Sequence, residues 1–306
     1  MTAISPREQR EVARASESGR GPVVFVHGLW LLASSWDRWR SLFEEHGYVT
    51  LAPSWPDDPE TVEEAHRHPE VFARKRVERV TQHFADVIRQ LSSPPALVGH
   101  SFGGLIVQRL AGQGLATVSV AIDPAPFRGV LPLPLSSLKA AFPVLGNPAN
   151  YGRAVELTFQ QFRFAWANAL SEDEAHELYE TYSVAAPGVP LFQAATANLN
   201  PWTAAKVDTT NPDRGPLLII SGAKDHTVPW AIANASYKRQ RRNPGVTEIR
   251  EIPNRGHSLT IDSGWREVAE VALAFVEQHQ PARAPAVGMN REVTGEDTRY
   301  TEEPRP

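Results

Sequence analysis

The chain has 306 residues, of which 42% are hydrophobic and 22% are charged, and its formal net charge is −4 at pH 7. A chain of this size and composition can bury a sizeable core. With this weak negative charge, the chain lacks the excess of positive charge that is typical of proteins that bind nucleic acid or an anionic membrane surface. The sequence contains no cysteine, which excludes disulfides, thiolate chemistry and cysteine-based metal sites.

Targeting and membrane segments are not indicated either. The first twenty residues carry several Arg and Glu residues and lack the apolar run of a signal peptide. No segment approaches the roughly 18 uninterrupted apolar residues of a spanning helix. We therefore expect a cytoplasmic protein without a membrane span and without a nucleic-acid partner. The oligomeric state is not indicated by the sequence.

The first part of the chain alternates strands with helices. Residues 1–20 are polar, and we expect a loose lead-in there. The β-branched and aromatic run 22–26 predicts a buried strand that ends at His27 and Gly28. Apolar spacing predicts a helix over 35–43, then a strand over 48–53. A short helix over 61–67 and a longer one over 71–91 follow.

Residues 95–107 combine an apolar run, a serine between two glycines and a second apolar run at helical spacing. This pattern predicts a strand, a sharp turn and a helix, which is a nucleophile elbow with Ser101 at its tip. Gly99 and Gly103 let strand and helix approach closely. The turn points the backbone N–H of Phe102 to the place where an oxyanion would form. We expect the second oxyanion donor to be the backbone N–H of Leu29.

After the elbow the alternation continues briefly and then breaks. Residues 117–122 predict a strand that ends at Asp123. From there to about residue 214 prolines are frequent, no strong strand is indicated, and 151–170 and 171–184 read as helices. We interpret 127–213 as an inserted helical cap over the catalytic edge. Strands over 216–222 and 246–252 and a helix over 265–278 resume the pattern. We expect the tail, 280–306, to be disordered.

The core of the protein would thus comprise residues 21–126 and 214–279, and its alternation predicts an α/β fold with a mostly parallel central sheet and helices on both faces. Over about 21–279 the sequence resembles the α/β-hydrolase superfamily. The motifs that carry this resemblance are His27-Gly28, the elbow, the acid-loop stretch 222–229 and the stretch Gly256-His257-Ser258. The resemblance implies an esterase- or lipase-like serine hydrolase that needs no cofactor. Dehalogenases and epoxide hydrolases are disfavoured because their elbow carries an aspartate.

The same resemblance implies a catalytic triad of Ser101, His257 and Asp225. A serine hydroxyl is a weak nucleophile, so it needs a base within hydrogen-bond reach and a group that orients this base. Asp123 is an alternative acid, because it also follows a predicted strand at the catalytic edge. We prefer Asp225, whose loop offers Gly222 for the turn.

The expected reaction is hydrolysis of a carboxylic ester through an acyl-enzyme. Lactone opening, C–C bond hydrolysis and cofactor-free perhydrolysis on the same triad remain open, as does a non-enzymatic ligand-binding protein of this fold. We expect an apolar small-molecule ester, because the inserted segment is rich in Phe, Trp and Leu. Trp30, Phe162 and Trp166 either line the substrate pocket or form the core of the cap. We predict no metal site, since Glu63, Glu64, His66 and His68 lie in a polar stretch that no other ligand cluster joins.

Overall fold

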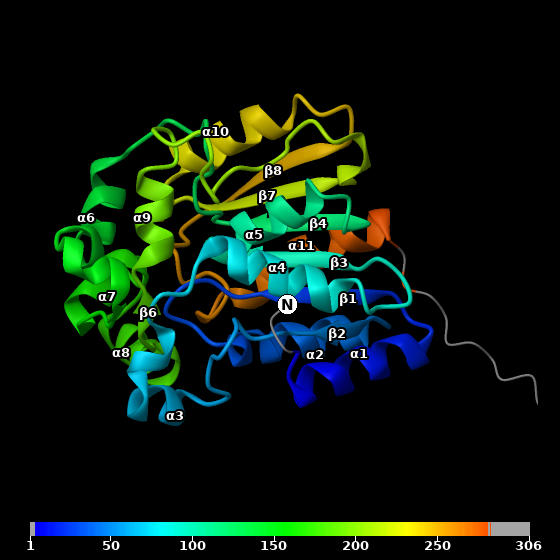
Figure 1. Cartoon of the computed structure of the whole chain (residues 1–306), viewed down its shortest axis with the longest axis horizontal. Helices are drawn as coiled ribbons and strands as arrows, with labels where there is room; N and C mark the ends of the chain where they lie inside the picture. Colours follow the sequence, from blue (N-terminus) through cyan, green and yellow to red (C-terminus); the bar gives the residue numbers. More distant parts are fainter. Residues whose placement is uncertain (1–3, 281, 283–306) are drawn as a thin grey trace, which may run out of the picture.

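A six-stranded sheet lies at the centre of residues 4–280 and 282, which the computed structural model of the chain describes (Figure 1). All neighbouring strands in it are parallel, in the order β2-β1-β3-β4-β7-β8. The strands are β1 (Pro22–Val26), β2 (Val49–Leu51), β3 (Ala96–His100), β4 (Val118–Ile122), β7 (Leu217–Gly222) and β8 (Thr247–Ile252). Strands β1 to β4 and β7 are buried along their whole length, in agreement with their mostly apolar sequences. The predicted parallel sheet is confirmed.

Helices cover both faces of this sheet, and alternate strand residues point to each face. On one face, Val24 and Leu97 belong to a core cluster with residues of α1 (Pro6–Ser18), α4 (Val77–Ile88), α5 (Phe102–Ala111) and α10 (Trp230–Gln240). On the other, Phe25 and Val98 pack with α2 (Asp37–Glu45) and α11 (Trp265–His279). Among the residues described, no helix has the length and apolar character needed to cross a bilayer.

The segment between β4 and β7 supplies most of the remaining helices, which gather at one end of the sheet (Figure 1). It comprises α6 (Leu135–Leu145), η3 (Pro148–Gly152), β5 (Ala154–Val155), α7 (Phe159–Ala165), α8 (Glu172–Tyr182), β6 (Ala186–Pro187), α9 (Val189–Ala195) and η4 (Pro212–Arg214). The helix predicted over 151–170 is wrong, because Thr158 caps a shorter helix in a capping box with Gln161. β5 and β6 pair antiparallel, a small sheet that the sequence did not indicate.

Two expectations for the first hundred residues need correction. Residues 6–18 form α1 instead of a loose lead-in, with a capping box between Ser5 and Glu8 and with Val12 and Ala15 buried. The polar composition conceals this narrow apolar face. The helix predicted over 71–91 begins only at Val77, after α3 (Val62–Arg67), η2 (Pro69–Phe72) and a left-handed residue, Arg74, with φ 62°. A further 3-10 turn, η1 (Ala33–Trp36), precedes α2.

At the other end of the chain, Gln280 follows α11, and its carbonyl oxygen accepts a hydrogen bond of 2.7 Å from the Tyr48 hydroxyl. The disordered tail was expected over 280–306. Residues 281 and 283–306 of it lie outside the described residues.

Helix α5 approaches the backbone of β1 very closely at Gly103, and this contact yields a stability prediction. A Cβ atom at Gly103 would lie 2.0 Å from the carbonyl oxygen of Val26, so Gly103→Ala must push α5 away from β1. We expect a loss of about 3 kcal/mol in the free energy of unfolding, measured by urea denaturation. Gly152→Ala is the control, since a Cβ there has no neighbour nearer than 3.9 Å. Equal stability of the two variants would contradict the prediction.

Candidate active site

Ser101 occupies the sharp turn between β3 and α5, with φ 56° and ψ −120°. A non-glycine residue at positive φ is strained, and the surrounding backbone holds it there. The Ser101 amide donates to the carbonyl of Ile122 at 2.9 Å, and its carbonyl accepts from the amide of Ala125 at 3.0 Å. A Cβ at Gly99 would lie 2.4 Å from the carbonyl oxygen of Gly103, so only glycine permits this approach of strand and helix.

The Ser101 hydroxyl begins a hydrogen-bonded chain of three side chains. Its Oγ lies 3.0 Å from Nε2 of His257, and Nδ1 of His257 lies 2.6 Å from Oδ2 of Asp225. The second carboxylate oxygen of Asp225 accepts from the amides of Thr227 at 2.6 Å and Val228 at 2.9 Å. Since Asp225 accepts from Nδ1–H, Nε2 is left free to accept the hydroxyl proton. The three side chains are at most 5% exposed.

Asp123 lies beside this chain without joining it. Its Oδ1 accepts from the amide of Gly222 at 2.8 Å, while Oδ2 lies 4.0 Å from Nδ1 of His257 and has no hydrogen-bond partner in the described part of the chain. Burial raises the pKa of the Asp123 carboxyl well above its ordinary value, and the neighbouring charge of Asp225 raises it further. Of the two candidate acids, Asp225 is therefore the one that bonds to the histidine.

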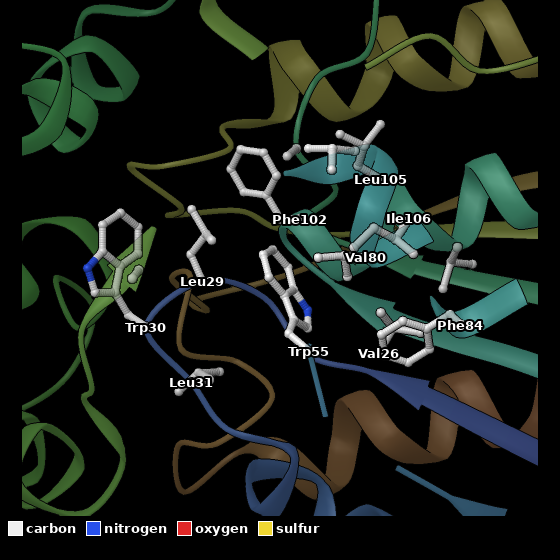
Figure 2. Packing of buried hydrophobic residues seen from close by; sticks show 14 of the residues in the cluster. Val26, Leu29, Trp30, Leu31, Trp55, Val80, Phe84, Phe102, Leu105 and Ile106 are labelled. Carbon is white, nitrogen blue, oxygen red and sulfur yellow. The ribbon is translucent and has the colours of Figure 1, made fainter. Parts of the chain in front are cut away.

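Two backbone amides flank the serine. Phe102 is the first residue of α5, and Leu29 follows β1 one residue after Gly28. Neither amide donates a hydrogen bond to any residue that the structure describes. A Cβ at Gly28 would meet the Ser101 Cβ at 2.9 Å, so the β1 loop lies directly against the elbow. Figure 2 shows the side chains of Leu29 and Phe102 in one buried cluster with Trp55.

The ring of His100 packs against the catalytic histidine. Its centroid lies 4.7 Å from that of His257 and 5.4 Å from that of Trp166. Both ring nitrogens of His100 lack a hydrogen-bond partner among the described residues. Burial lowers the pKa of His100 well below its usual value, and the charge of His257 lowers it further. His100 is thus a neutral packing partner of the base.

The ligand-type atoms of His100, Asp123 and His257 lie within 4.8 Å of one another, a grouping that could in principle hold a metal ion. Both ring nitrogens of His257 already bond to Ser101 and Asp225, however, so His257 has no free nitrogen to offer a metal ion. The stretch with Glu63, Glu64, His66 and His68 belongs to α3 and the residue after it, and His66 Nε2 lies 2.8 Å from the Ser183 carbonyl oxygen.

A cavity of about 240 Å³ opens beside Ser101. Of the three residues that the sequence left open between pocket wall and cap core, Trp30 and Trp166 line the cavity. Phe162 does not: its side chain is fully buried in the core cluster, and its ring stacks on that of Trp166 with the centroids 5.9 Å apart. The polar lining residues are Ser101, Ser137, Asn198 and Thr227, and the others are apolar.

Most of the residues that line the cavity were not predicted from the sequence, where only aromatic residues were considered as candidates. The wall consists largely of Ala, Leu and Pro side chains from 125–145 and from α9. The alternation of leucine and proline over 131–135 was the available signal. Several of these leucines are also exposed to solvent, with Leu131 70% and Leu133 68% exposed.

His27, at the end of β1, is buried beside the Leu29 amide. Its Nδ1 lies 2.9 Å from the carbonyl oxygen of Gly28, and its Nε2 accepts from the amide of Trp55 at 3.3 Å. The indole N–H of Trp55 in turn donates to the His27 carbonyl at 3.1 Å. Burial lowers the pKa of His27 from 6.5 to about 4. The ring is therefore neutral, with its proton on Nδ1.

Comparison with known proteins identifies the class. The model of the alpha/beta hydrolase family matches residues 23–271, so the chain belongs to this family. A search of curated protein sequences gives no significant match.

Among solved structures, the chain is similar to a monoacylglycerol lipase of Paleococcus ferrophilus, with 20% identity and a TM-score of 0.59 over 85% of this chain and 95% of that one. It is also similar to an extracellular alpha/beta-hydrolase from a Paenibacillus species (20% identity, TM-score 0.60, 83% and 98% covered). A pyrethroid hydrolase from Sphingobium faniae is similar as well (19% identity, TM-score 0.57, 84% and 97% covered). At these identities the likeness concerns the fold.

The lowered pKa of His27 predicts a pH dependence of stability. In the unfolded chain the His27 ring binds a proton below pH 6.5, whereas in the folded chain the ring stays neutral down to about pH 4. The contribution of His27 to the free energy of unfolding is therefore fully present above pH 6.5 and falls by about 3 kcal/mol as the pH drops to 4. We expect His27→Gln to lack this loss, measured by urea unfolding across that range. Asp58, whose carboxylate lies 3.6 Å from His27 Nε2 and whose pKa burial raises to about 6, is present in both proteins. The difference between the two curves therefore reports His27, and parallel curves would contradict the prediction.

Proposed function

We propose that this protein is a serine hydrolase that cleaves carboxylic esters through an acyl-enzyme, with Ser101, His257 and Asp225 as its triad. The observation that carries the proposal is the hydrogen-bonded chain from Ser101 through His257 to Asp225 at the wall of an apolar cavity. Two of the similar structures are named as a lipase and a pyrethroid hydrolase, which agrees with hydrolysis of apolar esters. The mechanism requires no cofactor.

In the acylation step the Ser101 oxygen attacks the carbonyl carbon while His257 Nε2 takes the hydroxyl proton. The carbonyl electron pair moves to its oxygen, and the amides of Leu29 and Phe102 stabilise this oxyanion, with about 3 kcal/mol for each donor. Asp225 holds the histidine in the required tautomer and stabilises the imidazolium. The ester C–O bond then breaks, and His257 returns the proton to the leaving alcohol. A water molecule then attacks the acyl-enzyme in the same way, and the carboxylic acid product is released.

We further propose that residues 127–213 act as a cap that sets substrate selectivity. The cavity lies between this segment and the elbow, and the segment supplies most of its lining. Its α7 is bonded to the core: Thr227 Oγ1 donates to the carbonyl of Ala165 at 2.7 Å, and the Ser258 amide donates to that of Trp166 at 3.1 Å. A cap that excludes water would strengthen the electrostatic interactions of the triad.

Labelling with an alkyl fluorophosphonate tests the catalytic serine. We expect one covalent adduct, located on Ser101 by mass spectrometry, and no adduct in Ser101→Ala. Products from ester, lactone and peroxide assays then separate ester hydrolysis from lactone opening, C–C bond hydrolysis and perhydrolysis on the same triad. A wild-type protein that is not labelled and turns over none of these substrates would be a ligand-binding protein of the same fold.

The acid can be identified by comparing two substitutions. Asp225→Asn keeps the shape of the side chain but favours the wrong histidine tautomer, so we expect ester turnover to fall on the order of 10⁴-fold. Asp123→Asn replaces a carboxyl that is not hydrogen-bonded to His257. We expect it to lose far less activity. Both are assayed on one ester, with thermal unfolding as the stability check; the reverse ranking would make Asp123 the acid.

The uncharged lining predicts substrate preference. Because the described residues that line the cavity include no charged side chain, a carboxylate or phosphate group inside it would be left without a counter-charge. We expect neutral p-nitrophenyl esters with apolar acyl chains to give a higher kcat/KM than dicarboxylate or phosphorylated esters. Ala140→Phe should narrow the cavity and shift the preference to shorter acyl chains, since Ala140 is part of the wall. Better turnover of charged esters would overturn this assignment.

A further inference from the structure

A buried ion pair outside the proposed triad lies next to the His27 ring. Lys75 Nζ contacts Asp58 Oδ1, and the two side chains are 2% and 3% exposed. Burial raises the pKa of Asp58 to about 6 and lowers the pKa of Lys75, because desolvation outweighs their mutual attraction. Such a pair is a poor source of stability, although losing one partner is costly. Its location suggests another role.

The ion pair joins the turn that contacts His27 to a second loop. Asp58 lies in the turn that follows β2, and Lys75 lies in the connection between η2 and α4. The amide of Asp58 donates to the carbonyl of Trp55 at 3.0 Å, which closes this turn. The amide of Trp55 donates in turn to His27 Nε2 at 3.3 Å, and Asp58 Oδ2 lies 3.6 Å from the same nitrogen. Lys75 therefore anchors the turn that holds the His27 ring.

The His27 ring determines the direction of the Leu29 amide. With Nε2 accepting from Trp55, the proton of the neutral ring is on Nδ1 and is donated to the Gly28 carbonyl oxygen at 2.9 Å. The Gly28 carbonyl and the Leu29 N–H belong to one planar peptide group, in which they point in opposite directions. Fixing the carbonyl on the His27 side therefore aims the N–H away from it.

We propose that Lys75 and Asp58 are positioning residues of the oxyanion hole: their contact holds the Trp55 turn, the turn holds His27, and His27 aims the Leu29 N–H at the reacting carbonyl oxygen. The inference rests on the proposed function, since it assigns Leu29 as a donor. Without the link, Asp58 and the Trp55 turn lose their anchor, and the Gly28–Leu29 peptide can rotate. Misplacing one catalytic group by about 1 Å can cost on the order of 100-fold in rate.

The test compares two variants that break the link with one that keeps it. Lys75→Met and Asp58→Ala remove the contact, whereas Asp58→Asn retains an oxygen that can accept from Lys75. Glu8→Ala is the matched control: Glu8 and His83 form another buried pair, at 2.9 Å and each 3% exposed, between α1 and α4. Thermal unfolding gives the stability of every variant, and all rates are measured well below the lowest midpoint.

The kinetic readouts are kcat and KM on one neutral ester and the inhibition constant of an alkylboronic acid, which forms a tetrahedral adduct with a catalytic serine. We expect Lys75→Met and Asp58→Ala to lower kcat about 10- to 100-fold and to weaken the boronic acid by a similar factor. KM should stay within about twofold, because the ground-state ester does not depend on the oxyanion donors. Asp58→Asn should recover most of kcat, and Glu8→Ala should leave it unchanged.

A readout without catalysis separates this inference from the proposed function. Hydrogen–deuterium exchange in the peptide that covers residues 27–31 should be faster in Lys75→Met and Asp58→Ala than in wild type, and unchanged in Glu8→Ala. Unchanged exchange in the link-breaking variants would overturn the positioning role whatever the activity. Faster exchange together with an unchanged kcat in these variants would show that the Lys75–Asp58 pair holds the loop but does not contribute to catalysis, and would overturn the proposal. A wild-type protein that neither reacts with fluorophosphonate nor hydrolyses esters would refute the proposed function, and the exchange data would still decide whether Lys75 and Asp58 hold the loop.

Discussion

The whole active-site region depends on the close packing of three backbone segments: the end of β1, the end of β3 and the start of α5. Glycines at positions 28, 99 and 103 allow contacts that a Cβ would forbid, with would-be distances of 2.0 to 2.9 Å to neighbouring atoms. This packing forces Ser101 to positive φ and leaves the first amide of α5 without a helical partner. The strain at the serine is thus compensated by the β-sheet core beneath it.

Local sequence patterns were sufficient to predict the part of the fold around the packing of β1, β3 and α5. The buried parallel strands appear as continuous apolar runs, and the elbow appears as a serine between glycines, because both depend on neighbouring residues. The resemblance to the α/β-hydrolase superfamily implied that Ser101, Asp225 and His257 meet at one edge of the sheet. Helix α1 was missed because its mostly polar composition conceals a narrow apolar face, and the short sheet of β5 and β6 because its strands are distant in sequence.

The choice between the two aspartates shows where sequence reasoning ends. Asp123 and Asp225 both follow strands at the same edge, and both are buried near His257. What separates them is their surroundings: two amides and the imidazole bond to Asp225, while one oxygen of Asp123 has no partner among the described residues. Burial and hydrogen bonding of this kind arise from tertiary packing, so no motif could reveal the raised pKa of Asp123. The same holds for the Lys75–Asp58 pair, whose members lie in unremarkable polar loops.

The anchoring of α7 divides the wall of the cavity into two parts with different freedom to change. The carbonyl groups of Phe164, Ala165 and Trp166 bond to the loops that carry Asp225 and His257, so a displacement of α7 would disturb the triad itself. Helices α6 and α9 contact the same cavity but make no such bond to those loops among the described residues. Evolution or directed mutagenesis can therefore reshape α6 and α9 to accept new substrates, while α7 is constrained by the chemistry and should vary little.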